Sequence, residues 1–123
     1  MSKKRRKRIC SKHGVDLVLT VTKYGDRFDC PVDQCDVRCW GGRTSTPADG
    51  KTRSSRMTAH EAFDPIWLHR HLTRREAYKR LAAFLGIPVG DCHMGMMSRD
   101  QCEKVVEFSR QFFRTVYKKG SQK

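Results

Sequence analysis

Cys10-Ser-Lys-His13 and Cys30-Pro-Val-Asp-Gln-Cys35 are the two short stretches of sequence that decide the fold. Each stretch brings two ligands of the type that zinc prefers, sulfur or imidazole nitrogen, into one tight turn, and two such turns close a tetrahedral site. The 16 residues between His13 and Cys30 are about what a hairpin needs to bring the turns together. The spacing therefore predicts a zinc-ribbon-like finger that holds one Zn²⁺ ion.

The fourth ligand stays open between two cysteines. Cys39 follows Cys35 after three residues and competes with it as the partner of Cys30, and the spacings do not rank the two. With either choice, protein side chains fill all four positions, so none is left for a reactive water. We therefore expect a structural ion and no catalytic one.

Short strands are expected around the two turns. Residues 15–22 are rich in β-branched side chains, and Tyr24-Gly25-Asp26 supplies a turn before residues 27–30, which predicts a hairpin. A third short strand is expected over residues 36–40. Residues 41–55 are rich in Gly, Ser, Thr and basic side chains and are expected to form an exposed loop.

The second half of the chain carries three helix-start patterns, in which a Ser or Thr precedes a Glu or Gln by three residues. They begin at Thr58, Thr73 and Ser98. We expect the first helix to break at Asp64-Pro65, the second to end at Gly86, and the third to carry an apolar face. The prediction is an α+β fold, with the finger followed by a small three-helix module.

These patterns divide the chain into five segments. A disordered basic tail, the finger, a loop, the helical module and a basic C-terminal tail are predicted over residues 1–9, 10–43, 44–56, 57–118 and 119–123. The first tail is expected to be disordered because a block of like charges buries nothing.

A second group of potential ligands contains Asp91, Cys92, His93 and Cys102. Cys92 and His93 are adjacent in the chain, which makes joint ligation of one ion geometrically awkward. Cys102 falls on the apolar face of the third helix. We therefore expect both cysteines to pack in the core as small apolar residues.

The net charge of +13 is concentrated at the two ends of the chain. Residues 1–14 carry seven excess positive charges and residues 98–123 carry four, whereas residues 15–97 are close to neutral. Such a balance favours a polyanionic partner such as nucleic acid. The candidate nucleic-acid-binding residues are Lys3, Lys4, Arg5, Arg6, Lys7, Arg8, Arg38, Trp40, Arg43, Arg110, Arg114 and Lys118.

Each of these candidates also has a simpler interpretation. A basic tail can serve only to keep the chain soluble, and cations near the end of a helix complement its dipole without any partner. Trp40, which the flanking arginines make a candidate platform for base stacking, can equally pack beneath the finger.

Several motifs of the chain resemble those of a known family. They are Cys30-Pro31 with a following Cys, the run from Met57-Thr-Ala-His60 through Asp64-Pro65 to Trp67, Leu72-Thr-Arg-Arg-Glu-Ala-Tyr78, and Cys92-His-Met-Gly-Met96 with Cys102. In this order, and from about Cys10 to Phe108, they resemble the zinc-finger-containing domain family of unknown function from bacteriophages and bacteria.

The resemblance implies an N-terminal finger of two Cys-containing knuckles, which correspond here to Cys10, His13, Cys30 and Cys35. The chain departs from the family in having His13 where a Cys is usual and in its wider second knuckle. A phage-encoded protein is implied, and the family brings no assigned activity or substrate.

The function expected is that of a small zinc-stabilised nucleic-acid-binding accessory protein. We find no phosphate loop, nucleophile elbow or paired carboxylates, so an enzyme is not expected. No apolar run of 18 residues and no export signal is present, which favours the cytoplasm, or the host cytoplasm for a phage protein. The alternative is a protein-interaction module that binds and inhibits or redirects a host protein, using the apolar helical face or exposed Met94, Met96 and Met97.

Overall fold

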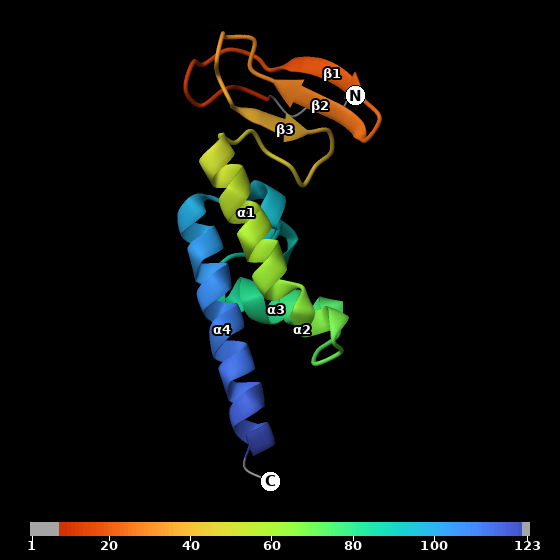
Figure 1. The fold of residues 1–123 in the computed structure, drawn as a ribbon, viewed down its shortest axis with the longest axis vertical. Coiled ribbons are helices and arrows are strands. Elements are labelled where there is room, and N and C mark those ends of the chain that lie inside the picture. Colours follow the sequence, from red (N-terminus) through yellow and green to blue (C-terminus); the bar gives the residue numbers. More distant parts are fainter. Residues whose placement is uncertain (1–7, 122–123) are drawn as a thin grey trace. The chain divides into compact units, whose positions relative to one another are not determined.

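An antiparallel sheet of three strands forms the N-terminal part of the protein (Figure 1). The computed structural model describes residues 8–121, and for residues 118–121 it describes the backbone alone. The strands follow one another in the order β1-β2-β3, and they span Val18–Thr22, Gly25–Asp29 and Arg38–Trp40. The predicted hairpin and third strand are therefore present.

One face of this sheet covers a small buried cluster. Leu19 pairs with Phe28 across β1 and β2, and Phe28 pairs in turn with Cys39 on β3. Since side chains alternate between the faces of a strand, Phe28 and Cys39 share one face. The cluster contains Cys10, Leu17, Cys30, Val37 and Cys39, with Phe28 and Cys35 packed against it.

Helices make up the rest of the fold. They are α1 (Gly50–Phe63), the one-turn α2 (Pro65–Leu68), α3 (Arg74–Leu85) and α4 (Arg99–Ser121), with short 3-10 turns η1 (Val89–Asp91) and η2 (Met94–Met96) between α3 and α4. The chain forms two compact units that divide within α1, between Arg53 and Ser54. The architecture is the predicted α+β one. Within residues 8–121, no helix is both long and apolar enough to cross a lipid bilayer.

The predicted starts of α3 and α4 are confirmed. The hydroxyl of Thr73 accepts a hydrogen bond from the backbone N–H of Glu76 at 3.1 Å. At α4 the capping is reciprocal, because Ser98 Oγ accepts from the N–H of Gln101 at 3.2 Å while Gln101 Oε1 accepts from the N–H of Ser98 at 3.0 Å. Helix α3 ends at Gly86, whose φ of 71° lies in the left-handed region that glycine adopts without strain.

Helix α1 begins at Gly50, so the loop predicted over residues 44–56 is wrong from that point onward. Two carboxylates explain the early start. Asp49 Oδ1 accepts the N–H of Thr52 at 2.8 Å, and Asp36 Oδ2 accepts the N–H of Gly50 at 2.9 Å. These bonds satisfy backbone donors that the first turn of a helix otherwise leaves without partners.

The helix start predicted at Thr58 is also wrong. Thr58 lies inside α1, where its hydroxyl donates to the carbonyl of Ser54 at 3.1 Å. A Ser or Thr can make this bond one turn back in any helix, so the capping pattern is ambiguous there. The break predicted at Asp64-Pro65 is present, because α1 ends at Phe63 and α2 begins at Pro65.

The ends of the described chain differ from the predicted tails. Residues 1–7 lie outside the described range, but Arg8 and Ile9 are ordered, so the disorder predicted through residue 9 is wrong for these two. The carbonyl of Arg8 accepts the N–H of Leu17 at 2.8 Å, and Ile9 forms a β-bridge with Asp16. Helix α4 continues past residue 118 to Ser121.

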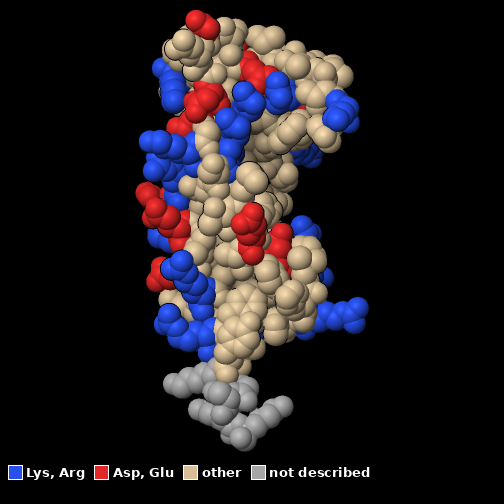
Figure 2. All heavy atoms as spheres, viewed as in Figure 1, with Lys and Arg blue, Asp and Glu red and all other residues tan. Residues whose placement is uncertain are grey.

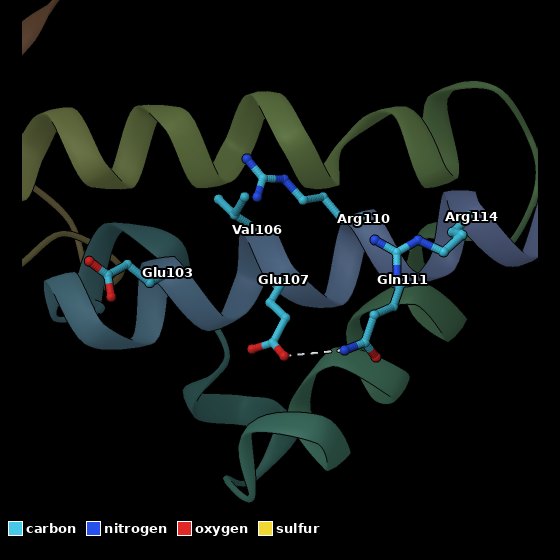
Figure 3. Close-up of a pocket in the computed structure, with 6 residues that line it drawn as sticks. All are labelled: Glu103, Val106, Glu107, Arg110, Gln111 and Arg114. Atoms are coloured by element: carbon cyan, nitrogen blue, oxygen red, sulfur yellow. Dashed lines mark hydrogen bonds between the residues drawn. The ribbon is translucent and has the colours of Figure 1, made fainter.

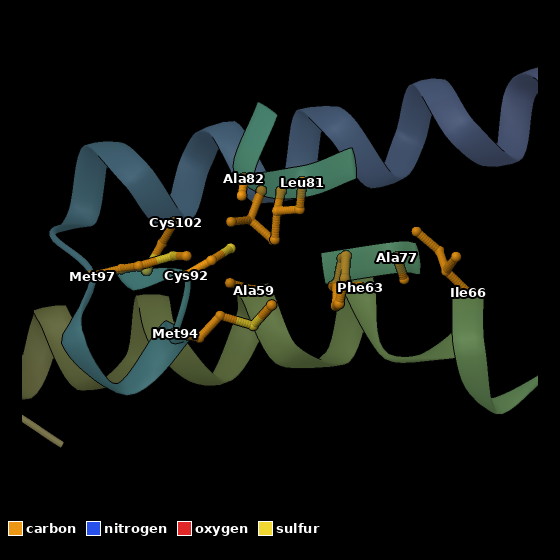
Figure 4. Close-up of a cluster of buried hydrophobic side chains, with 11 residues drawn as sticks. Ala59, Phe63, Ile66, Ala77, Leu81, Ala82, Cys92, Met94, Met97 and Cys102 are labelled. Carbon is orange, nitrogen blue, oxygen red and sulfur yellow. The ribbon is translucent and has the colours of Figure 1, made fainter. Parts of the chain in front are cut away.

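The helical module has one apolar core (Figure 4). It is made of the buried residues Ala59, Phe63, Ile66, Ala77, Leu81, Ala82, Cys92, Met94, Met97, Cys102 and Val105. Cys92 and Cys102 pack there as predicted. The expectation of an exposed methionine patch is wrong, because Met94 begins η2, Met97 follows it, and each is only 1% exposed.

Candidate metal centre

The first turn of the finger places Cys10 and His13 side by side. The N–H of Cys10 donates to the carbonyl of Val15 at 2.9 Å, and the N–H of Gly14 donates to the carbonyl of Cys10 at 2.8 Å. Gly14 has a φ of 68°, a left-handed conformation that favours glycine. The resulting tight turn leaves His13 Nδ1 3.6 Å from Cys10 Sγ.

The second turn closes in a similar way. The N–H of Cys30 donates to the carbonyl of Val37 at 3.0 Å, and the N–H of Cys35 donates to the carbonyl of Val32 at 3.1 Å. Gln34 takes up the reversal of the chain with a φ of 62°, which is unusual for a residue other than glycine. The turn therefore returns Cys35 to the neighbourhood of Cys30.

Together the two turns form a cluster of four ligands. The ligand atoms of Cys10, His13, Cys30 and Cys35 all lie within 4.8 Å of one another. The sulfurs of Cys10 and Cys35 are 3.6 Å apart, and His13 Nδ1 lies 3.7 Å from Cys30 Sγ. Zn–S bonds of about 2.3 Å and Zn–N bonds of about 2.0 Å at tetrahedral angles require an S–S separation of about 3.8 Å and an S–N separation of about 3.5 Å. The cluster thus fits one structural zinc ion.

The protonation of the two most buried ligands differs. Burial by itself raises the pKa of Cys10, but hydrogen bonds from the His13 side chain and from the backbone at Lys12 outweigh this and lower the pKa to about 6. Burial, together with the neighbouring sulfurs of Cys35 and Cys10, raises the pKa of Cys30 to about 11. A dication removes this penalty because it stabilises every thiolate at once. Zinc binding is therefore expected to release protons.

Asp36 ties the two turns to each other and to the start of α1. Lys12, from the first turn, places its ammonium 3.1 Å from Asp36 Oδ1. Hydrogen bonding from the Gly50 N–H and then from Lys12 lowers the pKa of Asp36. Arg53 donates to the backbone carbonyl of Asp36 at 2.9 Å. A Cβ at position 50 would lie 2.9 Å from Asp36 Oδ2, so the close approach needs glycine there.

Cys39 lies outside this cluster. It is the middle residue of β3, 4% exposed, and it pairs with Phe28 on the face that covers the buried cluster. The structure therefore brings Cys35, and not Cys39, together with the other three ligands. Spacing could not make this choice, because Cys39 is buried beside Cys10 and Cys30 and only the folded positions of the ligand atoms separate it from them.

The candidate nucleic-acid-binding residues of the basic tail and of the finger occupy different environments. Lys3, Lys4, Arg5, Arg6 and Lys7 lie outside the described residues. The guanidinium of Arg8 lies over the Phe28 ring, 4.2 Å from its centroid. Arg38 forms an ion pair with Asp29, whereas Trp40 and Arg43 are exposed. Trp40 therefore does not pack beneath the finger.

The remaining candidates lie on α4. Arg110 and Arg114 are exposed and one turn apart (Figure 3). Lys118 continues the same helix, but its side chain is outside what the structure describes. The residues on the finger and those on α4 belong to different compact units.

A three-stranded sheet, two ligand-bearing turns and a four-ligand Cys/His cluster define a small zinc-finger protein. A comparison with known protein families matches residues 15–112 to a family described as a zinc-finger-containing domain, and the chain belongs to that family. The matched region includes Cys30 and Cys35 and begins after Cys10 and His13. Searches of curated proteins and of solved structures returned no match.

Proposed function

We propose that this zinc-finger protein is a small nucleic-acid-binding accessory protein without catalytic activity. The observation that carries the proposal is the net charge of +13, most of it in the two terminal segments. A chain that places many Lys and Arg against phosphates releases condensed counterions and so gains affinity without reading sequence. This class of partner accounts for the charge balance most directly.

The metal centre supports a scaffolding role. Three cysteines and His13 supply four protein ligands, so the ion needs no water to complete a tetrahedron. An ion of this kind stabilises the fold that presents the binding residues and leaves no open position for hydrolysis.

The acidic residues of α4 lie in its first half, which also contains Arg99 and Lys104. Glu103 and Glu107 lie in its first half, and Glu107 accepts a hydrogen bond from Gln111 at 3.2 Å (Figure 3). Arg110 and Arg114 follow, and together these residues line a shallow hollow of about 450 Å³. Figure 2 shows Lys and Arg side chains at several separate places on one face, with acidic side chains among them. The later half of α4 thus offers a second basic surface.

The test is a salt titration of binding to labelled single- and double-stranded DNA and RNA. Replacing the six basic residues of the tail, Lys3 to Arg8, by Gln should lower the slope of log K against log salt by up to about 4 on a single strand. A control replaces Lys51, Lys79 and Lys104, three basic residues that lie outside the candidate residues. Absence of binding by the parent protein even at about 50 mM salt would refute the proposal.

A second candidate is a protein-interaction module that binds and inhibits or redirects a host protein. Val18, Leu19 and Val21 of β1 favour it, because these apolar side chains are exposed at the edge of the sheet. Such binding should saturate with one partner and survive moderate salt, which separates it from the first candidate.

On the family resemblance we also propose that the protein is phage-encoded, which the neighbouring genes would test.

A further inference from the structure

The face of the sheet opposite the buried cluster carries a row of three side chains, one from each strand. Thr20 pairs with Arg27, and Arg27 pairs with Trp40. Trp40 is 46% exposed, so part of its indole is accessible to a ligand. We propose that this face binds single-stranded nucleic acid, with a base stacked on the Trp40 indole and backbone phosphates held by Arg27 and Arg38. The inference rests on the proposed function and specifies the class of nucleic acid that is bound, a single strand.

A second row beside the first positions the arginines. Asp29 pairs with Arg38 across β2 and β3 and shares a face with Arg27. Its carboxylate lies 3.0 Å from Arg27 Nε and 3.2 Å from Arg38 Nε. A single carboxylate offsets only one of two guanidinium charges, so the pair retains a positive excess. Because Asp29 also restrains both side chains, they lose less conformational freedom when they bind phosphate.

The arrangement favours a single strand over a duplex. An indole can stack only on a base whose face is uncovered, and in a duplex the neighbouring base pairs cover both faces. Stacking is tolerant of sequence because every base has a π-face. Arg27, which sequence reasoning did not select, becomes the central residue of the site because the strand register places it between Thr20 and Trp40.

Tyr24 offers a matched control within the same finger. It is an aromatic residue that is 77% exposed, but it lies in the turn between β1 and β2 and outside the row. Trp40→Ala should raise the dissociation constant for an oligothymidine or oligouridine by between about 5-fold and about 150-fold. Trp40→Phe should restore much of the affinity, and Tyr24→Ala should leave it unchanged. Bound zinc per chain shows that each variant keeps the finger.

Tryptophan fluorescence gives a direct reading of stacking. The chain contains two tryptophans, Trp40 and Trp67, so the Trp67→Phe protein reports on Trp40 alone. Its emission should be quenched as oligothymidine is added, with the same midpoint as in the binding curve. Arg27→Gln should lower the salt slope by about 1 without abolishing the quenching.

The outcomes separate the two proposals. Loss of single-strand affinity in Trp40→Ala, with duplex binding unchanged, supports the stacking site. Unchanged single-strand affinity in Trp40→Ala, or no quenching, overturns the stacking site and leaves the proposed function intact. A parent protein that binds neither single strands nor duplexes at low salt overturns both.

Discussion

Removing zinc should unfold the finger, residues 10–43, and leave the helical module folded. The buried cluster of the finger holds only two aliphatic side chains, Leu17 and Val37. Burying each contributes about 1.5–3 kcal/mol, or about 3–6 kcal/mol together. Structural zinc sites in small fingers supply about 10–16 kcal/mol. The apolar contribution therefore cannot replace that of the ion.

The assay combines zinc analysis with NMR of backbone amides. In chelated protein, the amide signals of residues 10–43 should collapse to unfolded positions while those of α3 and of the first half of α4 stay dispersed. Returning zinc should restore the dispersed spectrum. Cys35→Ser should lower bound zinc well below one per chain. The matched variant Cys39→Ser should retain about one, because Cys39 is not among the four ligands.

Two results would refute this reasoning. One is a zinc-free protein whose finger signals remain dispersed, which would mean that the buried cluster suffices by itself. The other is the reverse behaviour of the two cysteine variants, with Cys39→Ser losing zinc and Cys35→Ser keeping it.

Four further predictions concern single side chains. Asp49→Ala removes the carboxylate that caps α1 and should cost about 1 kcal/mol in urea unfolding; no change would rule out the cap. Gln34→Gly relieves a left-handed backbone and should stabilise the zinc-loaded protein by about 0.5–1 kcal/mol, so a loss of stability would contradict it. Leu81→Ala empties a fully buried site and should cost about 2–5 kcal/mol, whereas the exposed Leu68→Ala should change stability by less than about 0.5 kcal/mol; equal losses would contradict the assigned core. Burial raises the pKa of Cys92 to about 11, so its thiol stays protonated at neutral pH, and alkylation should be slow there and accelerate toward pH 11; rapid labelling at neutral pH would be inconsistent with the packing.

The metal ligands could be predicted because their spacing is a local property of the chain. Two ligands in each tight turn, with a hairpin between the turns, need no knowledge of the rest of the fold. The choice between Cys35 and Cys39 is different in kind. It depends on where the folded chain places each sulfur, because Cys39 pairs with Phe28 and is buried near Cys10 and Cys30 without joining the four ligand atoms.

The helix boundaries likewise divide into those that a local sequence pattern predicts and those that depend on distant residues. The caps at Thr73 and Ser98 are made by residues three positions away, so their patterns are readable in the sequence. Helix α1 receives one cap from Asp49, but Thr52 stands where the pattern requires Glu or Gln. Its second cap comes from Asp36, 14 positions before Gly50, and a long-range partner leaves no local pattern. The exposed methionines were mispredicted for a related reason, since the burial of Met94 and Met97 depends on helices distant in sequence.

Because Asp36 contacts the first turn of α1, we expect the length of this helix to depend on the supply of a metal. Cys35 and Asp36 are neighbours in the chain, so the ion that fixes one also positions the carboxylate of the other against Gly50. A cell poor in zinc would then produce a chain whose first helix starts later. The start of α1 would then report whether the protein has bound its metal.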